Sequence, residues 1–523
     1  TDCYNCSLKR SFGGNVLLSL VVEKGTGMSE KIVLRSGGLN ETLYEKAQAV
    51  VLFLCRECVP GVGKLGLPES ICAAVRYTEQ QDPHFTDTGK ITRLVLEDKG
   101  TYRPVILAGV GVGKGCTPNH LRIAAGNAVR ELKHCRIRTA VTAAPLLRNP
   151  TRPHYVKALA EGLLLGSYAF TKYKSDAEAT EPMTITIGNE VPAAEAVIQE
   201  ATLIAQAVCH ARDLANEPGN VLTPEMLAHE AEQVAKDYGL KIEVLDEKAM
   251  RRLGMEALLA VGAGSVHPPR LVCLRYARGG DLPFTAFVGK GITFDSGGIS
   301  LKPGEGMGEM KDDMTGAAAV LGAIQAIAAL DLKVNILGIL ACAENMPSGS
   351  AQRPGDIVRS AAGKTIEVVN TDAEGRMVLA DAVWYAGEQG AERIIDIATL
   401  TGAVIIALGE HTSGIIANDD ALAETIKKAG HRVGEEWWQL PLVEEAPEMI
   451  KSTCADVKNS AGRPGGCITG GAFIGAFVKQ GLPWAHLDIG GTSSAKKTEG
   501  YIPEGCSAFG TATLIEFAKS LQK

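Results

Sequence analysis

The chain has 523 residues, of which 46% are hydrophobic and 22% charged, and its formal net charge is −7. These proportions exclude a disordered or low-complexity chain, and the mild negative charge disfavours general binding to nucleic acid or anionic membranes. A chain of this length is expected to form about two to four domains. Its 59 glycines, about 11% against the usual ~7%, indicate an α/β scaffold with tight turns between strands and helices.

The cysteines and the N-terminus give weaker signals. Thirteen cysteines at scattered spacing are typical of free thiols in a reducing compartment rather than of a disulfide scaffold. Two CxxC pairs, Cys3 with Cys6 and Cys55 with Cys58, could form a zinc site, but the gap between them is far longer than in zinc ribbons. Near the N-terminus a first β-strand at 16–22 is favoured over a signal peptide, and no stretch predicts a membrane span.

The N-terminal third alternates short apolar runs with segments of helical spacing. The expected strands are 16–22, 49–54, 93–96, 104–109 and 139–143, and the expected helices are 121–132 and 155–167. Residues 175–191 are polar and rich in Pro and Glu, so a domain boundary is expected there. A long helical pattern over 193–215 follows, as expected for a helix that links two domains.

The C-terminal part contains more runs that resemble buried strands. The expected strands are 241–245, 270–276, 284–289, 334–341, 394–399 and 484–489, and the expected helices are 315–330, 376–388 and 421–429. Apolar strands without alternation, joined by helices, predict a mainly parallel sheet that helices cover on both faces. The predicted class is therefore α/β, with a smaller N-terminal α/β domain at 1–190, a linker helix at 191–216 and a larger catalytic α/β domain at 217–523.

A glycine-rich loop at 109–115 follows one of the expected strands and suggests nucleotide binding. A Walker loop, however, needs Gly where Ala108 stands and Ser or Thr where Gly115 stands. The GxGxxG pattern also fails, because its third glycine position is occupied by Lys114 or Cys116, depending on where the pattern begins. We therefore interpret this loop as a structural turn between a strand and a helix.

Three polar clusters follow strands of the C-terminal part. Asp295 lies in FDSGG, Asp313 in a pair of aspartates expected to cap a helix, and Asp372 and Glu374 in NTDAEGR. In such sheets, ligands gather beyond the carboxyl ends of the strands. Carboxylates that converge in a dry crevice repel one another unless they bind cations. Four acidic ligands suit two divalent ions, Mg²⁺, Mn²⁺ or Zn²⁺, which could activate a water molecule.

Basic residues accompany these carboxylates. Lys302 and Arg376 add positive charge that suits a developing oxyanion or a bound anion. The neighbouring Lys311 and Asp312 are expected to be ordinary surface or turn residues. The residues alone leave two interpretations open, a binuclear metal site with an unknown substrate and a purely structural role for the acidic turns.

The C-terminal part resembles the leucyl aminopeptidase family of metallopeptidases. The matching strings are VGKGITFDSGGISLK at 288–302, ENMPSG at 344–349, NTDAEGR at 370–376, ATLTGA at 398–403 and WAHLDI at 484–489. The resemblance is dense from about 265 to 410 and looser in the N-terminal third. It implies hydrolysis of the first peptide bond of peptides with a free N-terminus, in a cytoplasmic homohexamer.

The resemblance also assigns roles to single residues. The metal ligands it implies, for two divalent ions per subunit, are Lys290, Asp295, Asp313, Asp372 and Glu374. Lys290 could serve only as a neutral amine, so the cations would have to lower its pKa. Lys302 would stabilise the oxyanion, and Arg376 would hold a bicarbonate that acts as the general base. Backbone amides near Leu400 would help to hold that anion.

The side-chain pocket that the resemblance implies departs from the family pattern. Its residues are Met310, Thr399, Gly402, Gly490 and Ser493. Met310 suits Leu-like substrates, whereas Gly490 and Ser493 stand where family members often carry Ala and Met, which makes the pocket roomier or more polar. Two alternatives are an inactive structural relative, against which the intact ligand and catalytic positions argue, and a nucleic-acid-binding role, which the net charge of −7 does not support.

Overall fold

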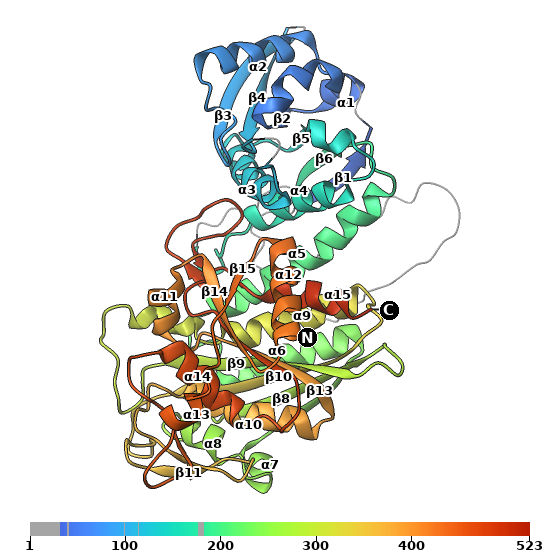
Figure 1. Cartoon of the computed structure of the whole chain (residues 1–523). Coiled ribbons are helices and arrows are strands. Elements are labelled where there is room, and N and C mark those ends of the chain that lie inside the picture. The colour runs from blue at the N-terminus through green and yellow to red at the C-terminus, as the bar shows by residue number, and fades with distance from the viewer. Residues whose placement is uncertain (1–31, 39–40, 99, 113–114, 176–181, 523) are drawn as a thin grey trace.

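The computed structural model describes residues 32–38, 41–98, 100–112, 115–175 and 182–522. The strand expected at 16–22 and the cysteines Cys3 and Cys6 lie outside these residues. Figure 1 shows the N-terminal part of the described chain above the larger C-terminal part, with α5 (Ala194–Asn216) running between them. The helix expected at 193–215 is therefore present.

The described N-terminal residues form a six-stranded sheet with the order β1-β6-β5-β2-β4-β3. Its strands are β1 (Ile32–Gly37), β2 (Ala49–Leu54), β3 (Ile91–Asp98), β4 (Thr101–Gly109), β5 (Thr139–Ala143) and β6 (Met183–Gly188). All neighbouring pairs are parallel except β3 with β4. Strand β6 lies inside the segment expected to be a boundary. Its first five residues alternate between buried and half-buried, as the period of a strand requires, and its backbone pairs with both β1 and β5.

Helices cover both faces of this sheet (Figure 1). They are α1 (Glu41–Lys46), α2 (Glu69–Gln81), α3 (Pro118–His134) and α4 (Pro153–Gly166), with a 3₁₀ segment η1 (Arg56–Leu65) and a short one, η3 (Pro145–Arg148). Helices α3 and α4, which the sequence predicted, pack with α5 on one face, and α2 packs with η1 on the other.

The expectation of free thiols is wrong for Cys55 and Cys58. These two cysteines form a disulfide because the start of η1 turns the chain and brings their Cα atoms to 5.1 Å.

The described C-terminal residues form an eight-stranded sheet with the order β15-β14-β17-β13-β9-β10-β8-β7. Its strands are β7 (Lys241–Leu245), β8 (Arg270–Ala277), β9 (Phe284–Asp295), β10 (Asn335–Asn345), β13 (Ala391–Ala398), β14 (Thr412–Ala417), β15 (Glu436–Gln439) and β17 (Trp484–Asp488). The central strands β17, β13, β9 and β10 are parallel to one another. The edge pair β14 and β15 is parallel as well, so the sheet is mainly parallel, as predicted, and three antiparallel pairs flank its centre. A fully buried strand is apolar whichever way it runs, which is why the sequence could not show the antiparallel pairs.

Two layers of helices enclose the larger sheet. One layer is α5, α6 (Pro224–Tyr238), α9 (Thr315–Ala329), α12 (Asp420–Val433) and α15 (Thr511–Ser520). The other is α8 (Glu256–Gly262), α10 (Gly375–Glu388) and α14 (Gly466–Gly475). Short elements complete the fold: α7 (Glu247–Arg252), α11 (Gly402–Leu408), α13 (Ala446–Met449), η4 (Met307–Asp312), β11 (Ile357–Arg359), β12 (Thr365–Glu367), β16 (Val457–Lys458), β18 (Ser494–Ala495) and β19 (Gly505–Cys506). Within the part of the chain that the structure describes, no helix is both long and apolar enough to cross a bilayer.

Candidate active site

The five predicted metal ligands converge at the carboxyl edge of the central strands. Lys290 and Asp295 belong to β9, and Asp313 lies between η4 and α9. Asp372 and Glu374 lie in the turn before α10. Carboxylate oxygens of Asp295, Asp372 and Glu374 lie within 4.8 Å of one another, a grouping that could hold a metal ion. The structure therefore brings together residues that are separated by up to 84 positions in the sequence.

Lys290 occupies the centre of this cluster. Its side chain is 3% exposed, and its Nζ lies 2.8 Å from both Asp313 Oδ1 and Glu374 Oε1. Nζ also donates a hydrogen bond of 2.9 Å to the carbonyl oxygen of Thr399. Burial lowers the pKa of Lys290, but attraction by Asp313, Glu374 and Asp295 outweighs it and raises this pKa above its ordinary value. Without cations in the cluster, Lys290 is therefore an ammonium.

Lys302 joins the other two carboxylates. Its Nζ lies 2.9 Å from Asp295 Oδ2 and 2.5 Å from Asp372 Oδ1. Asp295 also accepts hydrogen bonds from the backbone N–H of Gly297 and from Asn345 Nδ2. Burial opposes the charge on Lys302, yet the neighbouring carboxylates raise its pKa, so it remains a fixed cation in the cavity.

Two carboxylate oxygens of the cluster are left without partners. Asp313 Oδ2 and Glu374 Oε2 are buried and accept no hydrogen bond from the described residues. Burial raises the pKa of Asp313 and of Glu374, with repulsion by neighbouring carboxylates adding to it. Unpaired buried acceptors are costly. The donor set and its unsatisfied oxygens therefore fit bound cations.

The prediction that Asp313 caps a helix is wrong. Met314 holds the N-cap position of α9, and Asp313 Oδ1 instead accepts a 2.7 Å hydrogen bond from Thr399 Oγ1. Asp312 ends the η4 turn, as expected of a turn residue, but neither Lys311 nor Asp312 is an ordinary surface residue. Both line the cavity of the site, Lys311 Nζ donates to the carbonyl oxygen of Asn216, and burial raises the pKa of Asp312 to about 6. Polar residues in a turn are usually solvent-exposed, so the sequence did not indicate that these two would line a cavity.

Arg376 lies beside the cluster rather than on the wall of the cavity. It is buried in the first turn of α10, and its guanidinium donates a 2.9 Å hydrogen bond to the carbonyl oxygen of Asn459. Its Nε has no acceptor among the described residues. The Leu400 N–H, predicted to hold an anion, donates to Asp488 Oδ1 at 3.2 Å, so an anion there would compete with Asp488.

The cluster opens into a cavity of about 1040 Å³. The predicted residues that line it are Lys290, Asp295, Lys302, Met310, Asp313, Asp372, Glu374, Thr399, Leu400, Gly402, Gly490 and Ser493. The loop from Ser494 to Cys506 forms another part of the wall, as do Tyr168 and Phe170 from the N-terminal part. The cavity thus combines the metal-type cluster with the predicted side-chain pocket.

Sequence reasoning missed two residues that support the cluster. Asn345 ends β10 and donates both to Asp295 Oδ1 and to the carbonyl oxygen of Thr371. Thr371 is fully buried, and its hydroxyl donates to the carbonyl oxygen of Gly297. The signal for Asn345 was its position at the end of an apolar strand, next to the strand that carries Asp295. Nothing in the sequence indicated the contribution of Tyr168 and Phe170.

The fold and the site define the class: an α/β protein with a carboxylate and lysine centre at the carboxyl edge of its larger sheet. Family models identify it further. The model described as the cytosol aminopeptidase family, catalytic domain, matches residues 209–515, and the model of that family's N-terminal domain matches residues 84–177. The chain belongs to the cytosol aminopeptidase family and has its two-domain α/β architecture. It is an aminopeptidase, a hydrolase of peptide bonds.

Individual relatives agree with this assignment. A probable cytosol aminopeptidase of Alkaliphilus metalliredigens is 46% identical over 429 residues, covering 80% of this chain and 85% of the relative. One of Clostridium perfringens is 42% identical over 465 residues, covering 87% and 94%. Among solved structures, a mutant of tomato leucine aminopeptidase has a TM-score of 0.84 at 31% identity, covering 94% of this chain and 97% of that one. The bottromycin maturation enzyme BotP in complex with Mn has a TM-score of 0.82 at 33% identity, covering 91% and 100%.

Proposed function

We propose that this chain is an active binuclear-metal aminopeptidase that removes Leu-like N-terminal residues from peptides. The observation that carries the proposal is the pair of buried, unpartnered oxygens, Asp313 Oδ2 and Glu374 Oε2, at the edge of a large cavity. A purely structural ion-pair cluster would satisfy both oxygens, because leaving them unpaired lowers stability. Divalent cations would satisfy them.

Two divalent cations, Zn²⁺, Mn²⁺ or Mg²⁺, would be held by five residues, Lys290, Asp295, Asp313, Asp372 and Glu374. When bound, such ions supply Lewis-acid polarisation of a carbonyl and a water activated near neutral pH. The Lys290 side chain is already directed at Asp313 and Glu374. As a ligand it would lose its proton, because nearby divalent charge reverses the effect of the carboxylates on its pKa.

Lys302 would stabilise the negative charge that develops on the substrate's carbonyl oxygen. Its side chain is 23% exposed and lines the cavity, and Asp295 and Asp372 hold its ammonium as a positioned donor. Arg376 would hold a bicarbonate as the general base, through the Nε that finds no acceptor in the described part of the chain. The Asn459 carbonyl fixes the other side of the guanidinium, which limits how far it could move.

The side-chain pocket would be formed by Met310, Thr399, Gly402, Gly490 and Ser493. The Thr399 hydroxyl is engaged by Asp313, so Met310 would provide the apolar contact for a Leu-like side chain. We also propose a homohexamer in the cytoplasm, in keeping with the relatives named cytosol aminopeptidase. Analytical ultracentrifugation of the full chain tests the hexamer.

The decisive experiment is a hydrolysis assay with purified protein and added Zn²⁺ or Mn²⁺. A fluorogenic amide of leucine should be cleaved, and the same substrate with a blocked amine should not. Asp372→Asn should lose both bound metal and activity while keeping its circular dichroism spectrum. Cleavage under none of Zn²⁺, Mn²⁺ and Mg²⁺ would instead support the alternative, a catalytically inactive structural relative.

A further inference from the structure

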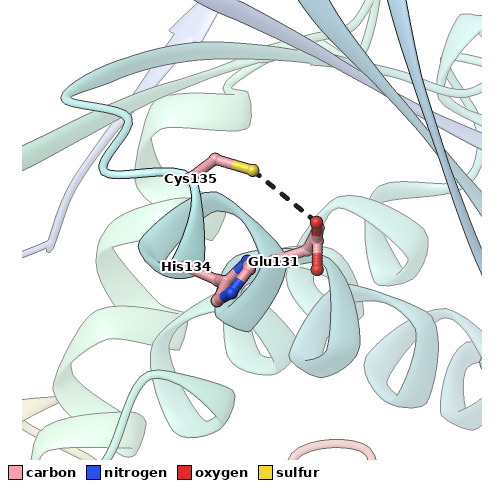
Figure 2. Close-up of side chains that lie close together, drawn as sticks. All are labelled: Glu131, His134 and Cys135. Carbon is pink, nitrogen blue, oxygen red and sulfur yellow. Dashed lines mark hydrogen bonds between the residues drawn. The ribbon is translucent and has the colours of Figure 1, made fainter.

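A second group of metal-binding side chains lies at the C-terminal end of α3, outside the active-site cavity. Glu131, His134 and Cys135 each offer one ligand atom, and these atoms lie within 4.8 Å of one another. Figure 2 shows the Cys135 sulfur directed at the Glu131 carboxylate, with the His134 ring near that same carboxylate. Cys135 Sγ lies 3.6 Å from Glu131 Oε1.

The spacing explains why these three side chains meet. Residues three and four apart lie on the same face of a helix, which places His134 and Cys135 next to Glu131. The last carbonyl groups of a helix carry partial negative charge, which favours a cation at this end of α3. Glu131 and Cys135 are half-buried and His134 is exposed, so the group is anchored on one side and open to solvent on the other.

We propose that Glu131, His134 and Cys135 bind one Zn²⁺ ion, separate from the catalytic centre. A thiolate, an imidazole and a carboxylate together are a typical donor set for zinc, and water would complete the tetrahedron. Hard ions such as Mg²⁺ would be disfavoured by the sulfur. Cys135 binds as the thiolate, so its proton is released to solvent when Zn²⁺ enters.

Arg93 on β3 is the group that competes with the metal. Its guanidinium nitrogen lies 3.0 Å from Glu131 Oε1 and 3.4 Å from Cys135 Sγ. The Arg93 side chain is 47% exposed, and ion pairs this exposed contribute little. Zn²⁺ carries twice the charge and forms a direct bond to the thiolate, so it displaces Arg93 toward solvent. Arg93 also shows that the position already attracts a cation.

Cobalt substitution tests the site in the full-length protein, because Co²⁺ bound to a thiolate gives an intense near-ultraviolet charge-transfer band. The band should appear in the wild type and in Asp372→Asn, and should be absent in Cys135→Ser. Asp372 belongs to the catalytic cluster, so this pair of variants separates the two sites and does not depend on activity. Absence of the band from the wild type, or its survival in Cys135→Ser, would overturn the proposal.

Alkylation provides an independent measurement with an internal control. Cys135 is half-buried and Cys454 is exposed, and both are free thiols. Micromolar Zn²⁺ should slow alkylation of Cys135, followed by mass spectrometry, and leave Cys454 unaffected. His134→Ala should weaken this protection at least about tenfold, as losses at metal sites do. Arg93→Gln should strengthen it up to about fivefold, the strength of an exposed ion pair. Equal protection of both cysteines, or weaker protection in Arg93→Gln, would contradict the proposed site.

Discussion

Lys290 fills the space in which a side chain at Gly375 would begin. A Cβ at Gly375 would lie 2.6 Å from Lys290 Cε and 2.7 Å from its Nζ. Lys290 extends from β9 past the start of α10 to reach Asp313 and Glu374. Its position between these carboxylates therefore depends on the absence of a side chain at residue 375.

Gly375→Ala should disable the enzyme without unfolding it. The new methyl group would push the Lys290 ammonium out of the cluster, and displacement of about 1 Å at a catalytic site can reduce the rate about 100-fold. The measurement is kcat on a leucine amide, together with the far-ultraviolet circular dichroism spectrum. Gly304→Ala is the matched control, because a Cβ at Gly304 would meet no atom within 4 Å. Comparable activity of the two variants would show that Lys290 tolerates displacement.

The sequence predicted the cluster of carboxylates and lysines more completely than its surroundings. Asp295, Asp372 and Glu374 follow buried strands or precede a helix, and the parallel centre of the sheet brings such positions to one edge. Lys290 could not be found from chemistry alone, since an ammonium does not ligate metals. The sequence also could not show that Asp313 would accept a hydrogen bond from Thr399 instead of capping a helix, because the two residues are 86 positions apart.

Other features depend on contacts for which no local pattern exists. The apolar residues of β6 were hidden in a polar segment. The direction of β8 and β14 cannot be deduced from sequence, because a buried strand is apolar whether it runs parallel or antiparallel to its neighbour. Tyr168 reaches the cavity only because the N-terminal part packs against the catalytic part. The exact domain limits at 190 and 217 stay a prediction.

Arg130 connects the N-terminal part to the wall of the active site. Its guanidinium, on α3, donates to the carbonyl oxygen of Gly500, in the loop that lines the cavity. Tyr501 donates to Asn119 on the same helix, which fixes the loop at a second point. A Cβ at Gly126 would lie 2.3 Å from the Gly500 oxygen, so helix and loop are in direct contact.

Arg130→Ala should therefore raise KM for leucine amides about two- to tenfold, the effect of losing one hydrogen bond, and change kcat less. The loop carries no catalytic residue, so its loosening affects substrate binding first. Steady-state kinetics measure both constants. Arg76→Ala, in an exposed ion pair with Glu69 on the far side of the same domain, should leave both unchanged. A fall in kcat alone would assign Arg130 a different role.

Removal of metal should lower the melting temperature of the protein. Without cations, the buried oxygens of Asp313 and Glu374 are unpaired and the carboxylates repel one another. Ligands that bind only the folded state raise its stability, by about 2.7 kcal/mol at a concentration 100 times Kd. Differential scanning calorimetry after dialysis against a chelator should show the decrease, and added Mn²⁺ should reverse it. The melting temperature of Asp372→Asn should change much less when metal is removed. A change as large as in the wild type would show that the stabilising metal binds elsewhere.

A buried pair on the neighbouring strands β13 and β17 should make stability depend on pH. His486 on β17 is fully buried and forms a hydrogen bond through Nδ1 with Asp396. Asp396 also accepts a 2.6 Å hydrogen bond from Trp484 Nε1. Burial lowers the pKa of His486, but Asp396 outweighs it and raises that pKa above its ordinary value. A raised pKa in the folded state means that the pair stabilises fully below about pH 6.5 and loses this contribution as the pH rises through the raised value.

His486→Gln should therefore melt below the wild type by a larger margin at about pH 6 than at about pH 9, because only the protonated imidazole pairs with Asp396 as an ion. Thermal unfolding followed by circular dichroism at both pH values gives the two margins. His229→Gln, on the exposed surface of α6, controls for loss of a histidine in general. A margin that stays constant or grows with pH would show that His486 is neutral in the folded protein, and that Asp396 binds it as an ordinary hydrogen-bond partner.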